Sequence, residues 1–233
     1  MTDREMNEPR ARVEKLRRFF YRAMTANAAG LTALWLAAPT LRTRLTAENG
    51  EMETAGAALL LGGFFVGIAQ AGRVLVDRKE WYAFSIPLLC LVAFLDEISF
   101  GRAYFGGEAW RVMGYECDGV HDLFAITMKL WRDRGCFLVD AALFGLIGAG
   151  VILAYLGRRS YMPALLAYIR RHPAFDYVRV AVILFGVSLL LDVDIVVHPF
   201  ALFLEELLEM NLGVALLFAA GAIQFDMGEA GRG

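Results

Sequence analysis

The chain has 233 residues, of which 58% are hydrophobic, and its formal net charge at pH 7 is −2. Ordinary soluble domains are roughly half apolar, so this composition argues against one. The near-neutral charge gives no reason to expect a nucleic-acid partner. The apolar residues form long runs separated by charged loops, which is typical of membrane proteins built from several helices. We therefore predict an all-α bundle of transmembrane helices.

Six apolar runs come close to the roughly 20 residues that a helix needs to cross a bilayer. The last run begins at Pro199, which suits the first turn of a helix because its missing N–H is not needed there. The predicted spans are 24–41, 54–72, 81–101, 137–157, 178–197 and 199–225. They form a six-span transmembrane domain over residues 23–225, followed by a tail at 226–233.

The placement of Lys and Arg predicts the orientation, because cytoplasmic loops carry an excess of both. Basic residues gather before the first span and in the second and fourth loops. We therefore expect both termini in the cytoplasm, an outer loop at 102–136 and a location in a bacterial inner membrane. Residues 1–22 and 158–177 are expected to lie on an anionic leaflet as interfacial segments. Plain basic flanks of the neighbouring spans would explain the same charges.

Three carboxylates interrupt the last span, at Glu205, Glu206 and Glu209. Each costs about 2.5–3.5 kcal/mol at the centre of a membrane helix, and less near an interface. Glu205 and Glu209 are four residues apart and share a helix face. A divalent metal ion would remove their mutual repulsion. A network of buried ion pairs and a set of proton-relaying carboxylates are the two alternatives.

The third span ends with a second polar group, Asp96-Glu97-Ile98-Ser99, and Arg102 follows. Asp96 and Ser99 are three residues apart, so a continuing helix would place them on one face. Arg102 could bind an anionic group or pair with one of the acids. A helix end that carries interfacial polar side chains is the alternative interpretation.

The third loop contains Asp118, His121 and Asp122. A helical turn would present Asp118 and His121 together, and Asp122 could orient the imidazole ring as a carboxylate partner. A single histidine is usually not a metal ligand, but the flanking acids favour a role as ligand or general base.

These three groups are predicted to meet near the outer face. At 1.5 Å per residue, the acids of the third and sixth spans lie roughly 5–15 Å below the outer boundary, a depth that the third loop can reach. The predicted ligands of a divalent Zn, Mn or Ca ion are Asp96, Glu97, His121, Glu205 and Glu209. The residues expected to act on a substrate are Glu206 or Asp122 as general base, with Ser99 and Arg102 positioning its head group.

The order of these motifs, Asp-Glu-Ile-Ser-x-Gly-Arg, Asp-x-x-His-Asp and Glu-Glu-x-x-Glu, resembles a family of bacterial multi-span membrane proteins of unassigned function. The resemblance covers residues 91–210. Many members have Glu-Glu-Ile-Ser-Trp-Gly-Gln where this chain has Asp96, Phe100 and Arg102 at the variable places. The resemblance implies about six spans and one constellation of these acids with His121, but no reaction.

The function expected from these residues is hydrolysis of a lipid or a lipid-linked substrate by a metal-dependent enzyme within the membrane, since a bound metal ion lowers the pKa of water. One alternative is a non-catalytic subunit whose acids pair with a partner's Arg or hold a structural ion. The other is a cation- or proton-linked transporter. Cys117 and Cys136 stand at the two ends of one loop, and whether they form a disulfide stays open.

Overall fold

The computed structural model describes residues 3–47, 50–78, 81–99, 110–112, 114–117, 126, 169, 172–192 and 198–227. The chain divides into two compact units, one made of residues 1–98 and 172–233 and the other of residues 99–171. Within the described residues, three helices are long and apolar enough to cross a membrane, and they cover 51–76, 174–191 and 199–225. Three of the six predicted spans therefore correspond to such helices. The predicted span at 137–157 lies outside the described residues.

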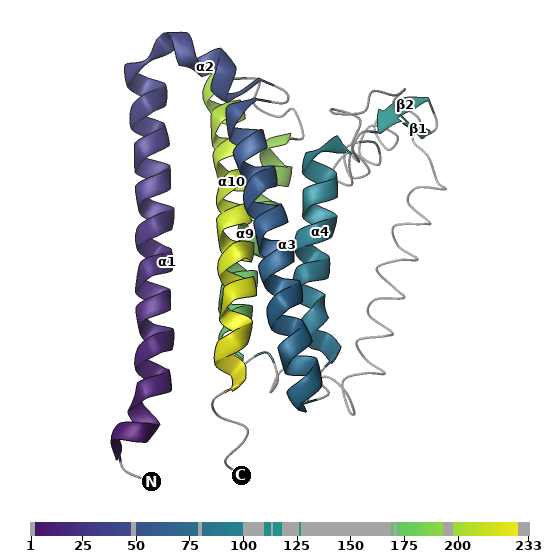
Figure 1. Cartoon of the computed structure of the whole chain (residues 1–233). Coiled ribbons are helices and arrows are strands. Elements are labelled where there is room, and N and C mark those ends of the chain that lie inside the picture. The colour runs from purple at the N-terminus through teal and green to yellow at the C-terminus, as the bar shows by residue number, and fades with distance from the viewer. Residues whose placement is uncertain are drawn as a thin grey trace. The chain divides into compact units, whose positions relative to one another are not determined.

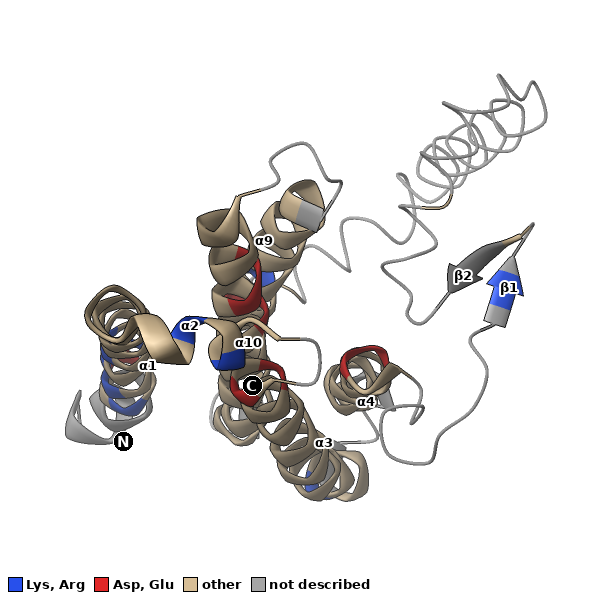
Figure 2. Ribbon diagram, turned by 90° about the horizontal axis from the view of Figure 1, so that it is seen from above, with Lys and Arg blue, Asp and Glu red and all other residues tan. Residues whose placement is uncertain are grey.

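The first unit is built around α10 (Pro199–Ala222), which continues as the 3₁₀ turn η3 (Ile223–Met227). Helices α1 (Asp3–Ala37), α3 (Glu51–Arg78), α4 (Ser85–Glu97) and α9 (Ala174–Asp192) all contact α10. Figure 2 shows α1 and α4 on different sides of this helix. The start of α1 and the end of α10 lie at the same end of the unit (Figure 1). Which side of a membrane that end faces stays a prediction.

The start of α10 is fixed by its first two residues. His198 has an extended backbone and its Nδ1 accepts a hydrogen bond of 3.1 Å from the N–H of Phe200, so it caps the helix. Pro199 follows at the first helical position, as predicted from the sequence. Further along, four fully buried alanines present a smooth surface to the neighbouring helices, namely Ala215, Ala219, Ala220 and Ala222. Small residues allow membrane helices to approach closely and gain van der Waals contact.

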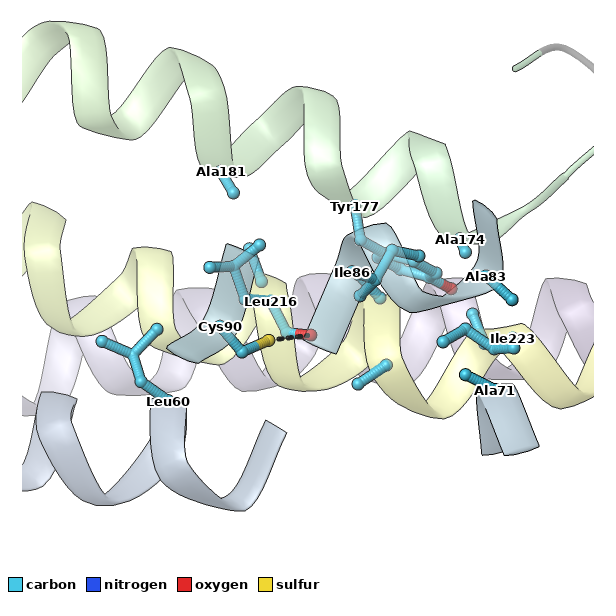
Figure 3. Packing of buried hydrophobic residues seen from close by; sticks show 14 of the residues in the cluster. Leu60, Ala71, Ala83, Ile86, Cys90, Ala174, Tyr177, Ala181, Leu216 and Ile223 are labelled. Atoms are coloured by element: carbon cyan, nitrogen blue, oxygen red, sulfur yellow. Dashed lines mark hydrogen bonds between the residues drawn. The ribbon is translucent and has the colours of Figure 1, made fainter. Parts of the chain in front are cut away.

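Glycines of α3 allow close packing against α4 and α10. A Cβ at Gly67 would lie 2.9 Å from Cβ of Pro87, and one at Gly63 would lie 3.1 Å from Sγ of Cys90 and 3.4 Å from Cα of Leu217. Cys90 is fully buried, and its thiol donates a long hydrogen bond to the carbonyl of Leu216 (Figure 3). Cys90 therefore packs as an apolar helix residue.

The third predicted span differs from the structure. Residues Trp81–Phe84 form a 3₁₀ turn, η1, and the α-helix that follows has only 13 residues, Ser85–Glu97. Pro87 explains the interruption, because in a helix continuing from Trp81 its ring would collide with the carbonyl of Ala83 and its missing N–H would leave that carbonyl unbonded. Helix α4 is therefore shorter than the roughly 20 residues of a full crossing.

The first predicted span also has different limits. Helix α1 runs without a break from Asp3 to Ala37, through the boundary expected near residue 22. It ends because Pro39 starts a separate short helix, α2 (Pro39–Leu45). The guanidinium of Arg42 in α2 donates to the carbonyl oxygens of Trp35 and Leu36, which satisfies the last turn of α1.

The second unit contains a small antiparallel hairpin within the predicted outer loop. Strands β1 (Trp110–Val112) and β2 (Tyr115–Cys117) pair with Trp110 opposite Cys117 and Val112 opposite Tyr115. Gly114 has a φ of 95°, which suits the tight turn between them. These strands were not predicted from the sequence, because each covers only three residues. Cys136 lies outside the described residues, so the disulfide prediction stays open.

Candidate functional site

Three helices bring acidic residues to the end of the first unit that lies opposite the start of α1. Helix α3 begins there, α4 ends there and α10 begins there. This topology places the first turn of α3, the last turn of α4 and the second and third turns of α10 in one layer. The acids in that layer, called here the carboxylate cluster, are Glu53, Asp96, Glu97, Glu205, Glu206 and Glu209.

Glu97 is at the centre of this cluster. Its carboxylate experiences the charges of Glu209, Glu206, Glu53 and Asp96, in that order of strength. Glu206 in turn experiences those of Glu209, Glu53 and Glu205. The acids of α4 and α10, which are about 110 residues apart in the sequence, therefore act on one another directly.

Gly56 of α3 provides the space for the side chain of Glu97. A Cβ placed on Gly56 would lie 2.7 Å from Oε1 of Glu97 and 3.6 Å from Cα of Met210. The backbone of α3 is close to α10 at this level too, since a Cβ on Gly213 would lie 3.2 Å from the carbonyl oxygen of Gly56. The absent side chain of Gly56 thus lets a carboxylate from α4 lie beside the α3–α10 contact.

Two carboxylate oxygens of the cluster are buried, Oε1 of Glu97 and Oε2 of Glu206, and neither has a hydrogen-bond partner among the described residues. A buried acceptor without a partner costs about 1–3 kcal/mol, and more when it is charged. Like charges at close range add to this cost. A proton, a cation or a cationic group from outside the described residues would offset it.

The predicted metal shell is only partly within the described part of the chain. Asp96, Glu97, Glu205 and Glu209 lie in the cluster, whereas His121, Asp122 and Arg102 lie outside the described residues. Among the residues that are described, no group of three His, Cys, Asp or Glu side chains has the arrangement of a metal site. The role of these residues as ligands therefore stays a prediction.

Ser99 does not share a helix face with Asp96, which corrects the expectation from their spacing. Helix α4 ends at Glu97, and Ser99 has a φ of 48°, in the left-handed region. A residue in this conformation commonly ends a helix, and glycine is the usual choice because it has no Cβ. Ser99 therefore belongs to the helix end, two residues beyond Glu97.

Replacing Ser99 with glycine is expected to raise the free energy of unfolding by up to about 1 kcal/mol, because the left-handed conformation is unfavourable for a residue with a Cβ. Ser99→Ala keeps the Cβ and serves as the matched control, with a change near zero. Thermal unfolding of the purified variants in detergent measures both. An equal gain in the two variants would contradict the argument from conformation.

Glu53 and Gly56 are cluster residues that the sequence analysis missed. The predicted second span began at residue 54, so Glu53 was assigned to the preceding loop, whereas α3 begins at Glu51. Gly56 had no signal of its own, because a sequence does not indicate which residue packs against a glycine. Only the packing of α4 against α3 pairs it with Glu97.

An amide pair lies beside the cluster on α10. Nδ2 of Asn27 in α1 donates a hydrogen bond of 3.1 Å to Oδ1 of Asn211, and Nδ2 of Asn211 donates one of 2.8 Å to the carbonyl of Leu207. Asn211 is 4% exposed. Such hydrogen bonds between membrane helices are worth roughly 0.6–2 kcal/mol, so this pair holds α1 against α10 close to the acids.

Comparison of the chain with known protein families, with curated proteins and with solved structures finds no match in any of the three.

Proposed function

We propose that the carboxylate cluster binds a divalent metal ion and that the protein uses it to hydrolyse a lipid or a lipid-linked substrate in a bacterial inner membrane. The observation that carries the proposal is the pair of buried oxygens on Glu97 and Glu206 that lack a donor among the described residues. Carboxylate oxygens are the donors that hard divalent cations such as Ca²⁺ and Mn²⁺ prefer. A cation would also offset the repulsion within the cluster.

In the proposed reaction, the residues of the protein would have the following roles. Glu97, Glu205 and Glu209 would hold the ion, and His121 is a further ligand predicted from the sequence. The ion, when bound, makes a water molecule acidic enough to act as a nucleophile near pH 7. Glu206 or Asp122 accepts the proton of that water. Ser99 and Arg102 would position the head group of the substrate.

The test is an assay of lipid hydrolysis by the purified protein in vesicles, with products identified by mass spectrometry. Turnover is expected to stop after chelation of divalent metal, to return when metal is added back, and to fall at least about 100-fold in Glu206→Gln, the usual loss for a general base. The control variant is Asp176→Asn. It removes an exposed carboxylate of α9 that pairs with Arg179. Turnover that survives chelation and the Glu206 substitution would contradict the proposal.

A non-catalytic role in a membrane complex is the second candidate. The same two buried oxygens favour it, because an Arg or Lys from a partner subunit would also satisfy them. Arg42 and Arg44 of α2 are engaged elsewhere, with α1 carbonyls and with Glu51. Under this proposal, the cluster forms an ion pair across the interface and no metal is bound.

Cation or proton transport is the third candidate, and polar side chains along the bundle favour it. Asn27 and Asn211 lie beyond the cluster on α1 and α10, and Oε1 of Gln70 in α3 is buried with no hydrogen-bond partner among the described residues. Flux of a cation into vesicles that contain the protein would distinguish this candidate from the hydrolase.

A further inference from the structure

The C-terminal half of α1 is held against the bundle by aromatic contacts at two levels. The ring of Phe20 lies 4.9 Å from that of Tyr177 in α9 and 5.3 Å from that of Phe218 in α10, measured between centroids. Fifteen residues later, the ring of Trp35 stacks on that of Phe203, at 5.2 Å. Residues 20–35 of α1 therefore run beside residues 203–218 of α10 in the opposite direction.

This packing sets the depth of the residues before Phe20. Tyr177 is three residues inside the apolar segment of α9, which starts at Ala174, and Phe218 is seven residues from the end of the segment of α10. At 1.5 Å per residue, Phe20 lies roughly 5–10 Å inside the membrane boundary. Helix α1 thus runs along the bundle from Phe20 to Trp35, and the interfacial location of residues 1–22 stays a prediction.

Three basic residues form a stripe on the outward side of α1. Lys15, Arg18 and Arg22 are spaced by three and four residues, so they share one helix face, and all three are exposed. Arg22 is rotated by about 200° from Phe20, so the stripe points away from the bundle. Side chains of a helix tilt toward its N-terminus, which directs all three toward the membrane boundary.

Two exposed aromatic side chains flank this stripe, Phe19 at 62% and Tyr21 at 55% exposure. Aromatic rings next to basic residues are typical of the level where lipid head groups meet the hydrocarbon. An outward-facing side chain at this level of a membrane helix would contact lipid.

Two of the three stripe residues, Lys15 and Arg22, have no acidic partner among the described residues. Residues 11–22 contain five basic residues and one acid, Glu14. Glu14 pairs with Arg17 at 2.9 Å and with Arg18 at 3.2 Å, while no described residue pairs with Lys15 or Arg22. Like charges at this spacing repel by about 0.2–0.5 kcal/mol for each pair. An anion bound between them makes the net interaction favourable.

We propose that Lys15, Arg18 and Arg22, flanked by Phe19 and Tyr21, bind the head group of an anionic phospholipid. The guanidinium and ammonium groups contact the lipid phosphate, and the two aromatic rings lie beside the acyl chains. The site is independent of the carboxylate cluster, which lies at the other end of the first unit (Figure 1).

The test counts lipids bound to the full chain in a nonionic detergent by native mass spectrometry. Phosphatidylglycerol and phosphatidylcholine with identical acyl chains are the probes. The wild type is expected to bind phosphatidylglycerol preferentially. A basic side chain near an anionic surface raises affinity about fivefold, so Lys15→Gln, Arg18→Gln and Arg22→Gln together are expected to lower it roughly 100-fold.

Three controls keep the proposal falsifiable. Arg179→Gln removes an exposed guanidinium that already pairs with Asp176 and should leave binding unchanged. Glu14→Gln releases Arg18 and should strengthen binding, even if the triple variant fails to fold. Inorganic phosphate at equal concentration should not displace the lipid. Equal binding of the two lipids by the wild type, undiminished binding by a folded triple variant, no strengthening by Glu14→Gln, or displacement by phosphate would each overturn the proposal.

Discussion

A divalent cation at a free concentration one hundredfold above its Kd is expected to raise the free energy of unfolding of the wild-type protein by about 2.7 kcal/mol. Replacing Glu97 and Glu206 together with glutamine should remove this gain, because amide oxygens carry no charge and bind cations more weakly. Both side chains belong to the carboxylate cluster, and each has a buried oxygen without a partner among the described residues.

The same double variant should be more stable than the wild type when no cation is present. Glutamine removes two carboxylates that repel the other acids of the cluster, and each amide can also donate a hydrogen bond to a neighbouring carboxylate. Chemical or thermal unfolding in detergent, with and without cation, measures both effects. Asp176→Asn is the control outside the cluster. An identical cation-dependent gain in wild type and double variant would place the binding site elsewhere.

Gly67→Ala is expected to lower the free energy of unfolding by about 1–3 kcal/mol, the usual range for overpacking. The new Cβ would lie 2.9 Å from Cβ, 3.2 Å from Cδ and 3.3 Å from Cα of Pro87. The proline ring is rigid and lies in the first turn of α4, so the whole helix must move away from α3. Because α4 carries Glu97 at its other end, this movement would also disturb the carboxylate cluster.

Gly72→Ala is the matched control in the same helix. Among the described residues, no atom outside its own stretch of helix lies within 4 Å of the position of its Cβ, and alanine is favoured over glycine in a helix by about 0.8–1 kcal/mol. This variant should therefore be as stable as the wild type or more stable. Thermal unfolding midpoints of the two variants give the comparison directly. A loss of stability of the same size in both would contradict the packing argument.

The last span was predictable because its signals are local. Pro199 after a polar residue marks the start of α10, and a long apolar run follows it, so the predicted limits 199–225 agree with the structure. The limits of the span at 178–197 were less accurate, since α9 begins four residues earlier, at Ala174. Residues 174–177 were assigned to the interfacial segment 158–177, but they belong to α9, where Asp176 pairs with Arg179 on the helix surface.

The third span was predicted less well because a proline was given too little weight. The run from residue 81 to 101 is apolar enough for a crossing, but hydropathy alone does not register the helix start that Pro87 imposes. The end of this helix was also mispredicted, because Ser99 adopts a positive φ there. Serine is not the residue that usually marks a left-handed position, so the end of α4 at Glu97 had no sequence signal.

The cluster itself was partly predictable. The cost of a carboxylate in an apolar helix identified Glu97 and Glu206, and the alternation of helix directions placed their helix ends in one layer. The contribution of Glu53 and the space left by Gly56 depend on which faces of α3 and α4 meet. The faces that meet are determined by packing between residues of the two helices, such as Gly67 and Pro87. The periodicity of either helix alone does not predict them.

Bound metal is the most direct test of the proposed cation site. The wild-type protein and the Glu97→Gln, Glu206→Gln double variant would be incubated with Zn²⁺, Mn²⁺ or Ca²⁺, freed of excess ion and analysed by inductively coupled plasma mass spectrometry. The proposal predicts close to one divalent ion in each wild-type chain and almost none in the double variant. A folded wild-type protein that retains none of the three ions would contradict it.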